Sequence, residues 1–513
     1  MRAATAACRL NHLACRVRSK ELTMLLPHGV HIAHPERLYI GGQWVPAHSG
    51  RLIEIISPDS EQVVARVAEA DAADMDAAVA AARAAFDHGP WPTTPPAQRI
   101  AAFRAMIDHL RPRADELARA WTAQIGGLAS FAGPMHQGAL FALDGIAGFA
   151  QDFPFIEQRP SHAAVAALIV QEPVGVVAAI APWNGPFGIM ANKVAYALLT
   201  GCCVVMKPSP ETPLEAYLIA EAAEAAGLPP GVVNLVPSHR EAADHLVNNP
   251  GVDKVSFTGS TVAGKRIGQV CAGRVARCTL ELGGKSAAIV RDDFAIDHAA
   301  KLLTGTITMM SGQVCAMLSR VIVPRARHDE LADAIAREMR GVVIGHSDDP
   351  AAQLGPVAMQ RQLERIEGYI AQGKASADLV TGGSRPSHLN RGYFIEPTLF
   401  ANVNNADAIA QEEIFGPVLA LIPVEDEEEA VAVANASAYG LNGSVLTHDA
   451  QAAWTIGRRI RTGGFGQNGL RMDFGLPFGG FKQSGVGREG GPEGLMPYVE
   501  TKTMLLDALP EGL

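Results

Sequence analysis

The feature that most limits the possible folds is a series of short apolar segments in which hydrophobic residues do not alternate with polar ones. Four such segments, rich in valine, lie at 174–180, 202–207, 232–236 and 252–259. Ala-rich stretches with helical spacing separate them. Strands buried on both faces have such sequences, and parallel strands require crossover helices between them. The pattern therefore predicts a doubly wound parallel sheet, with ligands bound beyond the carboxyl ends of its strands.

The second half of the chain repeats this pattern. Apolar segments at 287–292, 320–324, 418–424 and 443–447 again have helical stretches between them. A chain of 513 residues is long enough for more than one domain. We therefore expect two α/β domains, one in each half of the chain.

The residues before the first sheet predict helices. Segment 71–87 places its apolar residues on one helical face, and either Asp71 or Asp74 can cap it. After a proline-rich break, residues 98–125 predict one further helical run. Both segments precede the first valine-rich strand.

Composition and charge exclude several classes of function. Hydrophobic residues make up 48% of the chain and charged residues 19%, which is typical of a large globular core. The net charge is −10 at pH 7, so we expect no nucleic acid partner. The charge-free stretch 173–192 contains proline, glycine and asparagine, and it predicts short strands rather than a membrane-spanning helix.

The cysteines and the N-terminal segment bear on location. The cysteine number is odd and no pair has zinc-ribbon or C-x-x-C spacing, so we expect no metal site and a reducing, cytoplasmic compartment. The basic segment before Glu21 is too polar for a signal peptide. Residues 1–37 are therefore either a transit-like segment or an irregular extension, with Met24 as an alternative start.

Cys315 raises the central question of the sequence. It lies in SGQVCAMLSR (311–320), among small, uncharged residues and shortly after Gly312–Gln313, a pair that we expect to be flexible. A free cysteine in such a setting is either a small core residue or a nucleophile. This segment alone does not distinguish the two.

Three loops after predicted strands of the first sheet carry polar residues. Asn184 in APWNGPF can donate its amide to a developing oxyanion, or it can simply close a turn. Lys207 in KPSPETP can contact a ribose or a phosphate, or it can remain a solvated charge. In KVSFTGSTVAGKRI, Gly259 permits a tight turn, and Ser260 or Thr261 can cap a helix whose first amides suit a pyrophosphate. That segment lacks the middle glycine of G-x-G-x-x-G and also fits an ordinary strand–turn–helix.

Three further segments contain candidate functional residues or unusual backbone. Glu281 in LELGGKSAAIV lies between apolar residues, where burial raises a carboxyl pKa toward neutrality, as a general base requires. It can equally pair with a buried cation. Glu413 and Phe415 in EEIFGPV can hold a ribose and line a nicotinamide. The glycine-rich stretch 477–491 indicates either tightly packed irregular backbone or a flexible linker.

In this order, the segments resemble the aldehyde dehydrogenase superfamily. The resemblance rests on PWN, KPS, FTGSTxxG, ELGGKS, GQVC, EEIFGPV and PFGGxKxSGxGRE, and it extends from about Leu38 to Lys502. Several independent motifs in a fixed order are far more specific than any one of them. The resemblance implies NAD(P)-dependent oxidation of an aldehyde to a carboxylic acid.

The family roles carry over by position. Cys315 would be the nucleophile, Asn184 the oxyanion donor and Glu281 the base that activates water, with Lys193 supporting the site. A glutamate at 281 favours water over coenzyme A as the acyl acceptor, so a hydrolytic, non-acylating enzyme is expected. The alternatives are a coenzyme A-acylating enzyme and a non-catalytic binding or structural member of the same fold.

The resemblance also implies a cofactor site. NAD is the expected cofactor, and NADP remains open because Pro210 stands where many NAD-preferring members have a glutamate. The expected cofactor contacts are Trp183, Lys207, Ser209, Pro210, Gly259, Ser260, Gly264, Leu282, Glu413 and Phe415.

A substrate tunnel is implied as well. The expected tunnel residues are Gly185, Ile189, Val314, Met472 and Phe478. Because Gly185 stands where bulkier side chains are common, we expect medium or bulky hydrophobic aldehydes, whether terpenoid, aromatic or aliphatic. A broad-specificity enzyme is the alternative.

Domain limits follow from the same resemblance. A Rossmann-like NAD(P)-binding domain would span 38–153 and 172–283, and an α/β catalytic domain would span 284–483. Residues 154–171 and 484–513 would form a small β element for oligomerisation. Its C-terminal strand would add to the sheet of a neighbouring subunit, so a homodimer or homotetramer is expected.

Overall fold

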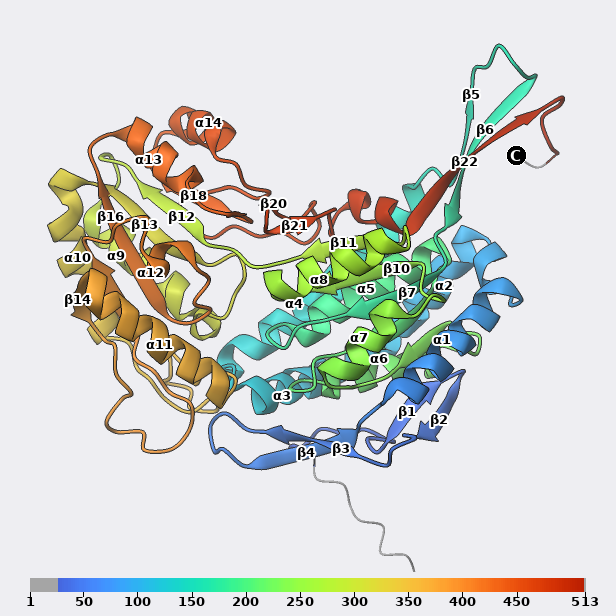
Figure 1. Cartoon of the computed structure of the whole chain (residues 1–513), viewed down its shortest axis with the longest axis horizontal. Coiled ribbons are helices and arrows are strands. Elements are labelled where there is room, and N and C mark those ends of the chain that lie inside the picture. Colours follow the sequence, from blue (N-terminus) through green and yellow to red (C-terminus); the bar gives the residue numbers. More distant parts are fainter. Residues whose placement is uncertain (1–25, 512–513) are drawn as a thin grey trace, which may run out of the picture.

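The computed structural model describes residues 26–511, which form two α/β lobes and a projecting β arm (Figure 1). Most of the expected extension 1–37, including the alternative start at Met24, lies outside the described residues. Within residues 26–511, no helix is both long enough and apolar enough to cross a membrane.

The first lobe is built on one large sheet. Its strands are β1 (Arg37–Ile40), β2 (Gln43–Pro46), β7 (Val176–Ile180), β8 (Cys203–Lys207), β9 (Val233–Leu235), β10 (Lys254–Thr258), β11 (Arg277–Glu281) and β21 (Gly485–Val486). Their order across the sheet is β2-β1-β9-β8-β7-β10-β11-β21. The strands from β9 to β11 are parallel, and the outer ones are antiparallel. The doubly wound sheet predicted from the valine-rich segments is confirmed, and every residue of β7 and β8 is buried.

Helices cover this sheet. They are α1 (Ala72–Asp87), α2 (Pro96–Leu110), α3 (Ala114–Ile125), α4 (Ala129–Asp152), α5 (Pro186–Thr200), α6 (Leu214–Ala225), α7 (Arg240–Asn248) and α8 (Thr261–Gly273). Asp71 caps α1, and Asp74 completes a capping box by accepting from the backbone of Asp71. The single helical run predicted for 98–125 is wrong, because a 3-10 turn at Arg111–Arg113 separates α2 from α3. Pro112 causes the break, since it has no N–H to donate within a helix.

The second lobe has its own mostly parallel sheet. Its strands are β12 (Ser286–Val290), β13 (Leu318–Pro324), β14 (Asp378–Thr381), β15 (Thr398–Ala401), β16 (Val418–Val424), β18 (Gly443–Leu446) and β19 (Gly466–Gln467). Their order is β14-β15-β16-β13-β12-β18-β19, and only β14 is antiparallel to its neighbour. The covering helices are α9 (Ile296–Thr308), α10 (Arg325–Arg340), α11 (Gln360–Ser376), α12 (Ala408–Gln411), α13 (Glu427–Asn435) and α14 (Ala450–Arg459).

Small antiparallel sheets complete the fold. The arm consists of β5 (Ile156–Arg159), β6 (Ala166–Pro173) and β22 (Val499–Leu506), and it projects from the first lobe (Figure 1). Two short pairs are β3 (Leu52–Ile56) with β4 (Val63–Ala68), and β17 (Tyr439–Gly440) with β20 (Phe481–Lys482). The segment 484–513, which we expected in the arm, divides its strands: β22 joins the arm, whereas β21 extends the first sheet.

The two large sheets meet end to end. The chain passes from β11 to β12 through Gly283 and Gly284, and both glycines are tightly packed against the second lobe. An added Cβ at Gly283 would lie 2.4 Å from the Glu413 carboxylate, and one at Gly284 would lie 2.4 Å from the Cys315 carbonyl. The carboxyl ends of β7, β8, β10 and β11 therefore face the segments that lead into β13 and β16. Parallel strands bring their loops together at such an edge, which makes it the place to look for a site.

Candidate active site

The carboxyl ends of the first sheet carry several of the residues singled out from the sequence. Lys207 is the last residue of β8 and Glu281 the last residue of β11. Ser260 caps α8 by accepting from the Ala263 N–H at 3.3 Å, which leaves the helix start directed at the sheet edge. In that first turn an added Cβ on Gly264 would lie 2.3 Å from the Leu282 side chain, so only glycine permits this packing.

The segment before Cys315 has a backbone conformation that most residues avoid. Met310, Ser311 and Gly312 have φ values of 50°, 55° and 72°, in the left-handed region. Such a conformation costs about 1–2 kcal/mol for a residue with a side chain, so neighbouring contacts must hold it. Gly312 also passes close to Gly416, where an added Cβ would lie 2.2 Å from the backbone. The strained turn thus brings the Cys315 segment (residues 309–317) against the loop before β16.

Two side chains of the Cys315 segment form hydrogen bonds to the backbone of residues 355–358. The Ser311 hydroxyl donates to the Gly355 carbonyl at 2.9 Å, and the Gln313 side-chain oxygen accepts from the Ala358 N–H at 2.9 Å. Gln313 is only 1% exposed. The flexibility that we expected at Gly312–Gln313 is therefore wrong, because buried hydrogen bonds fix both the turn and the residue after it.

Cys315 is half-buried at the meeting point of the two sheets. Burial raises the pKa of its thiol to about 12, and the nearby carboxylates of Glu413 and Glu281 add to this rise. The backbone N–H groups of Ala316 and Cys315 act in the opposite direction. Since the thiolate is the reactive form, a base must take the proton before this sulfur can attack.

Asn184 lies beside the Cys315 segment. Its side-chain Nδ2 donates to the Gln313 carbonyl at 2.9 Å, two residues before Cys315. Its own carbonyl accepts from the Trp121 indole N–H at 3.0 Å. The preceding Trp183 ring meets the Phe415 ring edge to face, with the ring centroids 5.2 Å apart. The loop after β7 therefore contacts both segments of the second lobe that surround the cysteine.

Glu281 is a buried carboxyl without a hydrogen bond. Its side chain is 3% exposed, and among the described residues neither carboxylate oxygen has a partner. Burial raises its pKa well above the usual value, and the Glu489 charge adds to this, whereas Lys193 and Arg488 oppose it. A buried polar group without a partner normally binds water or a ligand. Glu281 can therefore hold a water molecule and accept its proton.

Lys193 belongs to a buried network near Glu281. Its fully buried Nζ forms an ion pair with Glu489 and lies 3.2 Å from the Ser256 hydroxyl oxygen. That hydroxyl donates to Glu489 at 3.1 Å and accepts from the Tyr498 hydroxyl at 3.0 Å. The network holds charged groups next to the Glu281 carboxyl without contacting it by hydrogen bonds.

Removing one partner of this buried pair should be strongly destabilising. Replacing Glu489 by alanine leaves the Lys193 charge without a partner, at a cost of about 3–5 kcal/mol. We expect a clear drop in the apparent melting temperature, measured at a fixed heating rate. The double variant Lys193→Met/Glu489→Gln removes both charges and should recover part of the loss. An unchanged melting temperature in Glu489→Ala would contradict the pairing.

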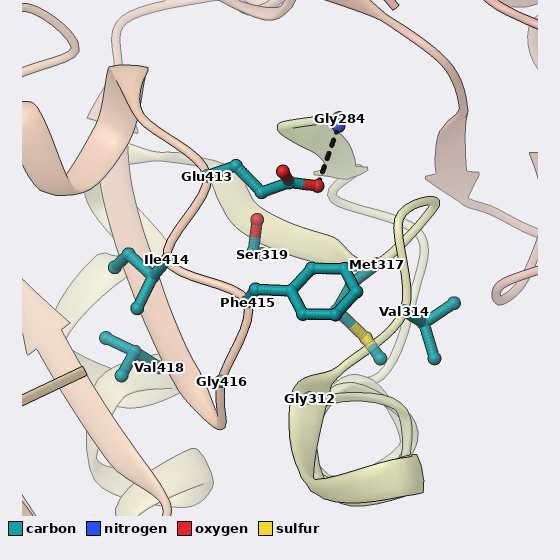
Figure 2. A pocket seen from close by; sticks show the side chains of 10 residues that line it. All are labelled: Gly284, Gly312, Val314, Met317, Ser319, Glu413, Ile414, Phe415, Gly416 and Val418. Atoms are coloured by element: carbon teal, nitrogen blue, oxygen red, sulfur yellow. Dashed lines mark hydrogen bonds between the residues drawn. The ribbon is translucent and has the colours of Figure 1, made fainter. Parts of the chain in front are cut away.

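Glu413 and Phe415 line a narrow pocket within the second lobe, between the Cys315 segment and the loop before β16 (Figure 2). The Glu413 carboxylate accepts from the Gly284 N–H at 3.0 Å, and burial raises its pKa to about 7. The Phe415 ring lies across the pocket beside Met317 (Figure 2). The Gln362 amide donates to the Phe415 carbonyl at 2.8 Å and so fixes this loop.

The residues present fit a dinucleotide. The N-terminus of α8, beyond Ser260, offers backbone amides to a pyrophosphate. Lys207 is buried, and burial lowers its pKa to about 8. A polar ligand would stabilise this buried ammonium group, so Lys207 is suited to bind one. Pro210 lines a cavity of about 480 Å³, in which Glu211 and Arg361 form an ion pair at 2.6 Å. Ser209 contacts the Glu211 carboxylate through its hydroxyl.

The expected tunnel residues lie in different surroundings. Gly185 precedes α5, and an added Cβ there would contact only Ile189, at 3.4 Å. Val314 and Phe478 pack against the same core of the second lobe. The Phe478 N–H donates to the Glu489 carbonyl at 2.5 Å, which ties it to the Lys193 network. Met472 remains 39% exposed at the surface.

Three residues of this site were missed by reasoning from the sequence. Glu489 stands within the glycine-rich stretch 477–491, where the charged pair Arg488–Glu489 among glycines was the available signal. Gln313 belongs to the GQVC motif but was regarded only as part of a flexible pair. Trp121 gave no signal, because a tryptophan on an apolar helix face is usually a core residue.

Two facing, mostly parallel sheets, with a cysteine, an amide and a buried carboxyl where they meet, define a two-lobed α/β protein with a candidate active site between its lobes. A profile described as the aldehyde dehydrogenase family matches residues 44–504, and the chain belongs to this family. The protein is thus an enzyme that oxidises aldehydes.

Similar proteins are known by sequence and by structure. A geranial dehydrogenase of Castellaniella defragrans is 43% identical over 92% of this chain and 98% of its own. A 3-succinoylsemialdehyde-pyridine dehydrogenase of a Pseudomonas species is 39% identical over 91% of this chain and 98% of its own. The crystal structure of a Mycobacterium tuberculosis aldehyde dehydrogenase complexed with NAD+ has a TM-score of 0.90 and 44% identity, covering 94% of this chain and 100% of its own. The expected family and fold class are therefore confirmed.

Proposed function

We propose that this enzyme uses NAD to oxidise hydrophobic aldehydes to carboxylic acids through a thioester on Cys315. The observation that carries the proposal is the convergence at the facing sheet ends. The Asn184 amide is bonded to the segment that holds Cys315, and the Glu281 carboxyl nearby has no partner among the described residues. A nucleophile, an oxyanion donor and a base are the three groups that oxidation through a thioester requires.

The residues act in sequence. The Cys315 thiol gives its proton to water, its sulfur bonds to the aldehyde carbon, and the π electrons of the carbonyl move to the oxygen, which becomes an oxyanion. The Asn184 Nδ2 and the Cys315 N–H donate hydrogen bonds to this oxygen. When bound, the dinucleotide supplies the acceptor for the hydride that leaves the carbon. Glu281 then takes a proton from water, and the resulting hydroxide attacks the thioester. The C–S bond breaks, and the proton left on the acid passes to the departing sulfur, which gives the carboxylate and the Cys315 thiol.

The proposed cofactor site lies across both lobes. Glu413 and Lys207 would hold the two riboses, the start of α8 the pyrophosphate, and Phe415 with Trp183 would flank the nicotinamide. The complex of the M. tuberculosis relative with NAD+ supports NAD. NADP use remains the alternative, since Pro210 supplies no carboxylate to repel a 2′-phosphate.

The proposed substrates are hydrophobic. The geranial dehydrogenase relative acts on a terpenoid aldehyde by name, which supports this class. In this chain the absence of a side chain at Gly185 leaves space beside Ile189, next to the Asn184 amide. Apolar surroundings favour aldehydes that bury hydrocarbon, at roughly 25 cal/mol per Å².

A panel of aldehydes tests the function. We expect kcat/KM with NAD to be highest for citral, octanal and benzaldehyde, and lower for acetaldehyde and for a cationic aldehyde. The product should be the free acid without any requirement for coenzyme A. Formation of acyl-coenzyme A would instead identify the acylating alternative, and no turnover of any aldehyde with either NAD or NADP would contradict catalysis.

Filling the space at Gly185 should change specificity. Its φ of −134° lies outside the left-handed region that favours glycine, so Gly185→Phe introduces a ring without requiring that conformation. We expect a loss in kcat/KM for citral of about tenfold to a hundredfold, with little loss for acetaldehyde. Gly185→Ala is the matched control and should behave like the wild type. Equal losses for small and bulky aldehydes would show that this position does not border the substrate.

The remaining proposals concern domain limits, oligomeric state and location. We propose that 38–153 and 172–283 form the NAD-binding domain and 284–483 the catalytic domain, since the two sheets divide between β11 and β12. We also propose a homodimer or homotetramer, because apolar residues such as Ile156 and Leu505 are exposed on the arm. We also propose the cytoplasmic location that the cysteine content of the sequence predicts.

A further inference from the structure

Trp121 links α3 to the peptide that carries Asn184. It is fully buried, and its indole N–H donates to the Asn184 carbonyl at 3.0 Å. The two residues are 63 positions apart in the sequence. The bond therefore connects a buried residue of α3 to the backbone of the proposed oxyanion donor.

Hydrogen bonds hold both the backbone carbonyl and the side chain of Asn184. Its carbonyl is fixed by Trp121, and its side-chain Nδ2 donates to the Gln313 carbonyl at 2.9 Å. Because a peptide unit is planar, fixing the carbonyl also fixes the plane that leads into Gly185. Glycine has no side chain to set that plane by packing, and its backbone is unusually free. The direction of the Asn184 side chain thus depends on the indole bond.

Trp121 is itself immobile. The ring packs so closely on Gly127 that an added Cβ there would lie 1.9 Å from it. The His136 ring stands edge-on to Trp121, with the centroids 6.2 Å apart, and stacks on Phe187 at 5.7 Å. Phe187 lies in the first turn of α5, just beyond Gly185. The indole of α3 is therefore tightly packed against α4 and lies near the start of α5.

We propose that Trp121 is a positioning residue that aims the Asn184 amide at the oxyanion. The inference rests on the proposed function, in which Asn184 stabilises that charge. The Trp121 indole bonds to the backbone carbonyl of Asn184 and not to the side-chain amide that would meet the oxyanion. Its effect on the reaction runs through Asn184, since preorganised donors lose most of their value when they are displaced by about 1 Å.

Trp121→Phe tests the proposal, because it keeps an aromatic ring and removes the N–H. We expect the rate of NADH formation in a single turnover to fall by about tenfold to a hundredfold. The Kd for NAD and the rate of Cys315 alkylation by iodoacetamide should stay within about twofold, since neither needs the amide. The matched control is Trp91→Phe, because Trp91 is also buried and its indole N–H has no partner in residues 26–511. This control should turn over like the wild type.

A double-mutant cycle with Asn184→Ala separates positioning from a general structural effect. If Trp121 acts through Asn184, adding Trp121→Phe to Asn184→Ala should change the single-turnover rate little further. If the two losses multiply, or if Trp121→Phe alone has the wild-type rate, the proposal is overturned. Should Trp121→Phe fail to fold, benzothienylalanine at position 121 keeps the bicyclic shape without the N–H and is expected to give the same loss.

The same data separate this inference from the proposed function. If the wild-type enzyme forms no NADH with any aldehyde, the proposed function itself is wrong. If the wild type turns over and Asn184→Ala has no effect, Asn184 is not the oxyanion donor and the inference fails with it. If Asn184→Ala is impaired and Trp121→Phe is not, only the role of Trp121 is refuted.

Discussion

Replacement of Cys315 by alanine is expected to reduce aldehyde-dependent NADH formation by at least about four orders of magnitude, because the variant loses the sulfur on which the proposed thioester forms. NAD binding should persist, since the proposed contacts at Lys207, Glu413 and α8 are untouched. Turnover is measured by NADH absorbance and binding by calorimetry. Full turnover in Cys315→Ala would refute the role of the sulfur.

The pKa of the Cys315 thiol, raised to about 12, adds a pH dependence to this test. Below that pKa the thiolate fraction grows about tenfold per pH unit, so alkylation of the cofactor-free enzyme by iodoacetamide should accelerate from pH 7 to 10. This component should be absent in Cys315→Ala. Cys278→Ala, which removes another half-buried thiol, is the matched control and should retain both turnover and the Cys315 reaction. A pH-independent rate would contradict a buried, protonated sulfur.

Replacement of Glu281 by glutamine is expected to slow hydrolysis of the thioester by about a hundredfold or more, since general-base catalysis contributes that much. The first turnover should remain fast, so NADH should appear as a burst of about one equivalent per active site, followed by a slow phase. Mass spectrometry of the intact protein should then detect the acyl group on Cys315.

Hydroxylamine supplies the control for Glu281. It attacks a thioester without needing a base, so it should restore turnover of Glu281→Gln and yield the hydroxamate. Loss of the burst itself would show that Glu281 acts earlier, on the Cys315 proton. Unchanged steady-state turnover would show that this carboxyl is not the base.

Much of the fold could be predicted because its signals are local. A strand buried on both faces must be apolar throughout, so the segments that form β7, β8, β10 and β13 could be recognised from their composition. The break between α2 and α3 was missed because helical spacing continues through Arg111–Arg113 and only Pro112 interrupts it. The left-handed turn at Met310 and Ser311 left no trace either, since neither residue is a typical choice for that conformation.

The candidate site was predictable in residue type but not in its supports. Asn184, Lys207, Ser260 and Glu281 stand at or just after strand ends, and parallel strands gather such residues at one edge. Their partners come from elsewhere in the chain. Glu489, which pairs with Lys193, is 296 positions away from it. Nothing in the local sequence of either residue indicates the other.

The sequence by itself determined the two parallel sheets, the order of their strands along the chain and the identity of the polar groups at their ends, because strand burial and turn chemistry are properties of short segments. Only the tertiary structure decided which carboxyl stays without a partner, how far the pKa of Cys315 rises, and that Trp121 holds the Asn184 peptide. These properties depend on burial and on contacts between distant segments, and both arise only when the two lobes are packed together.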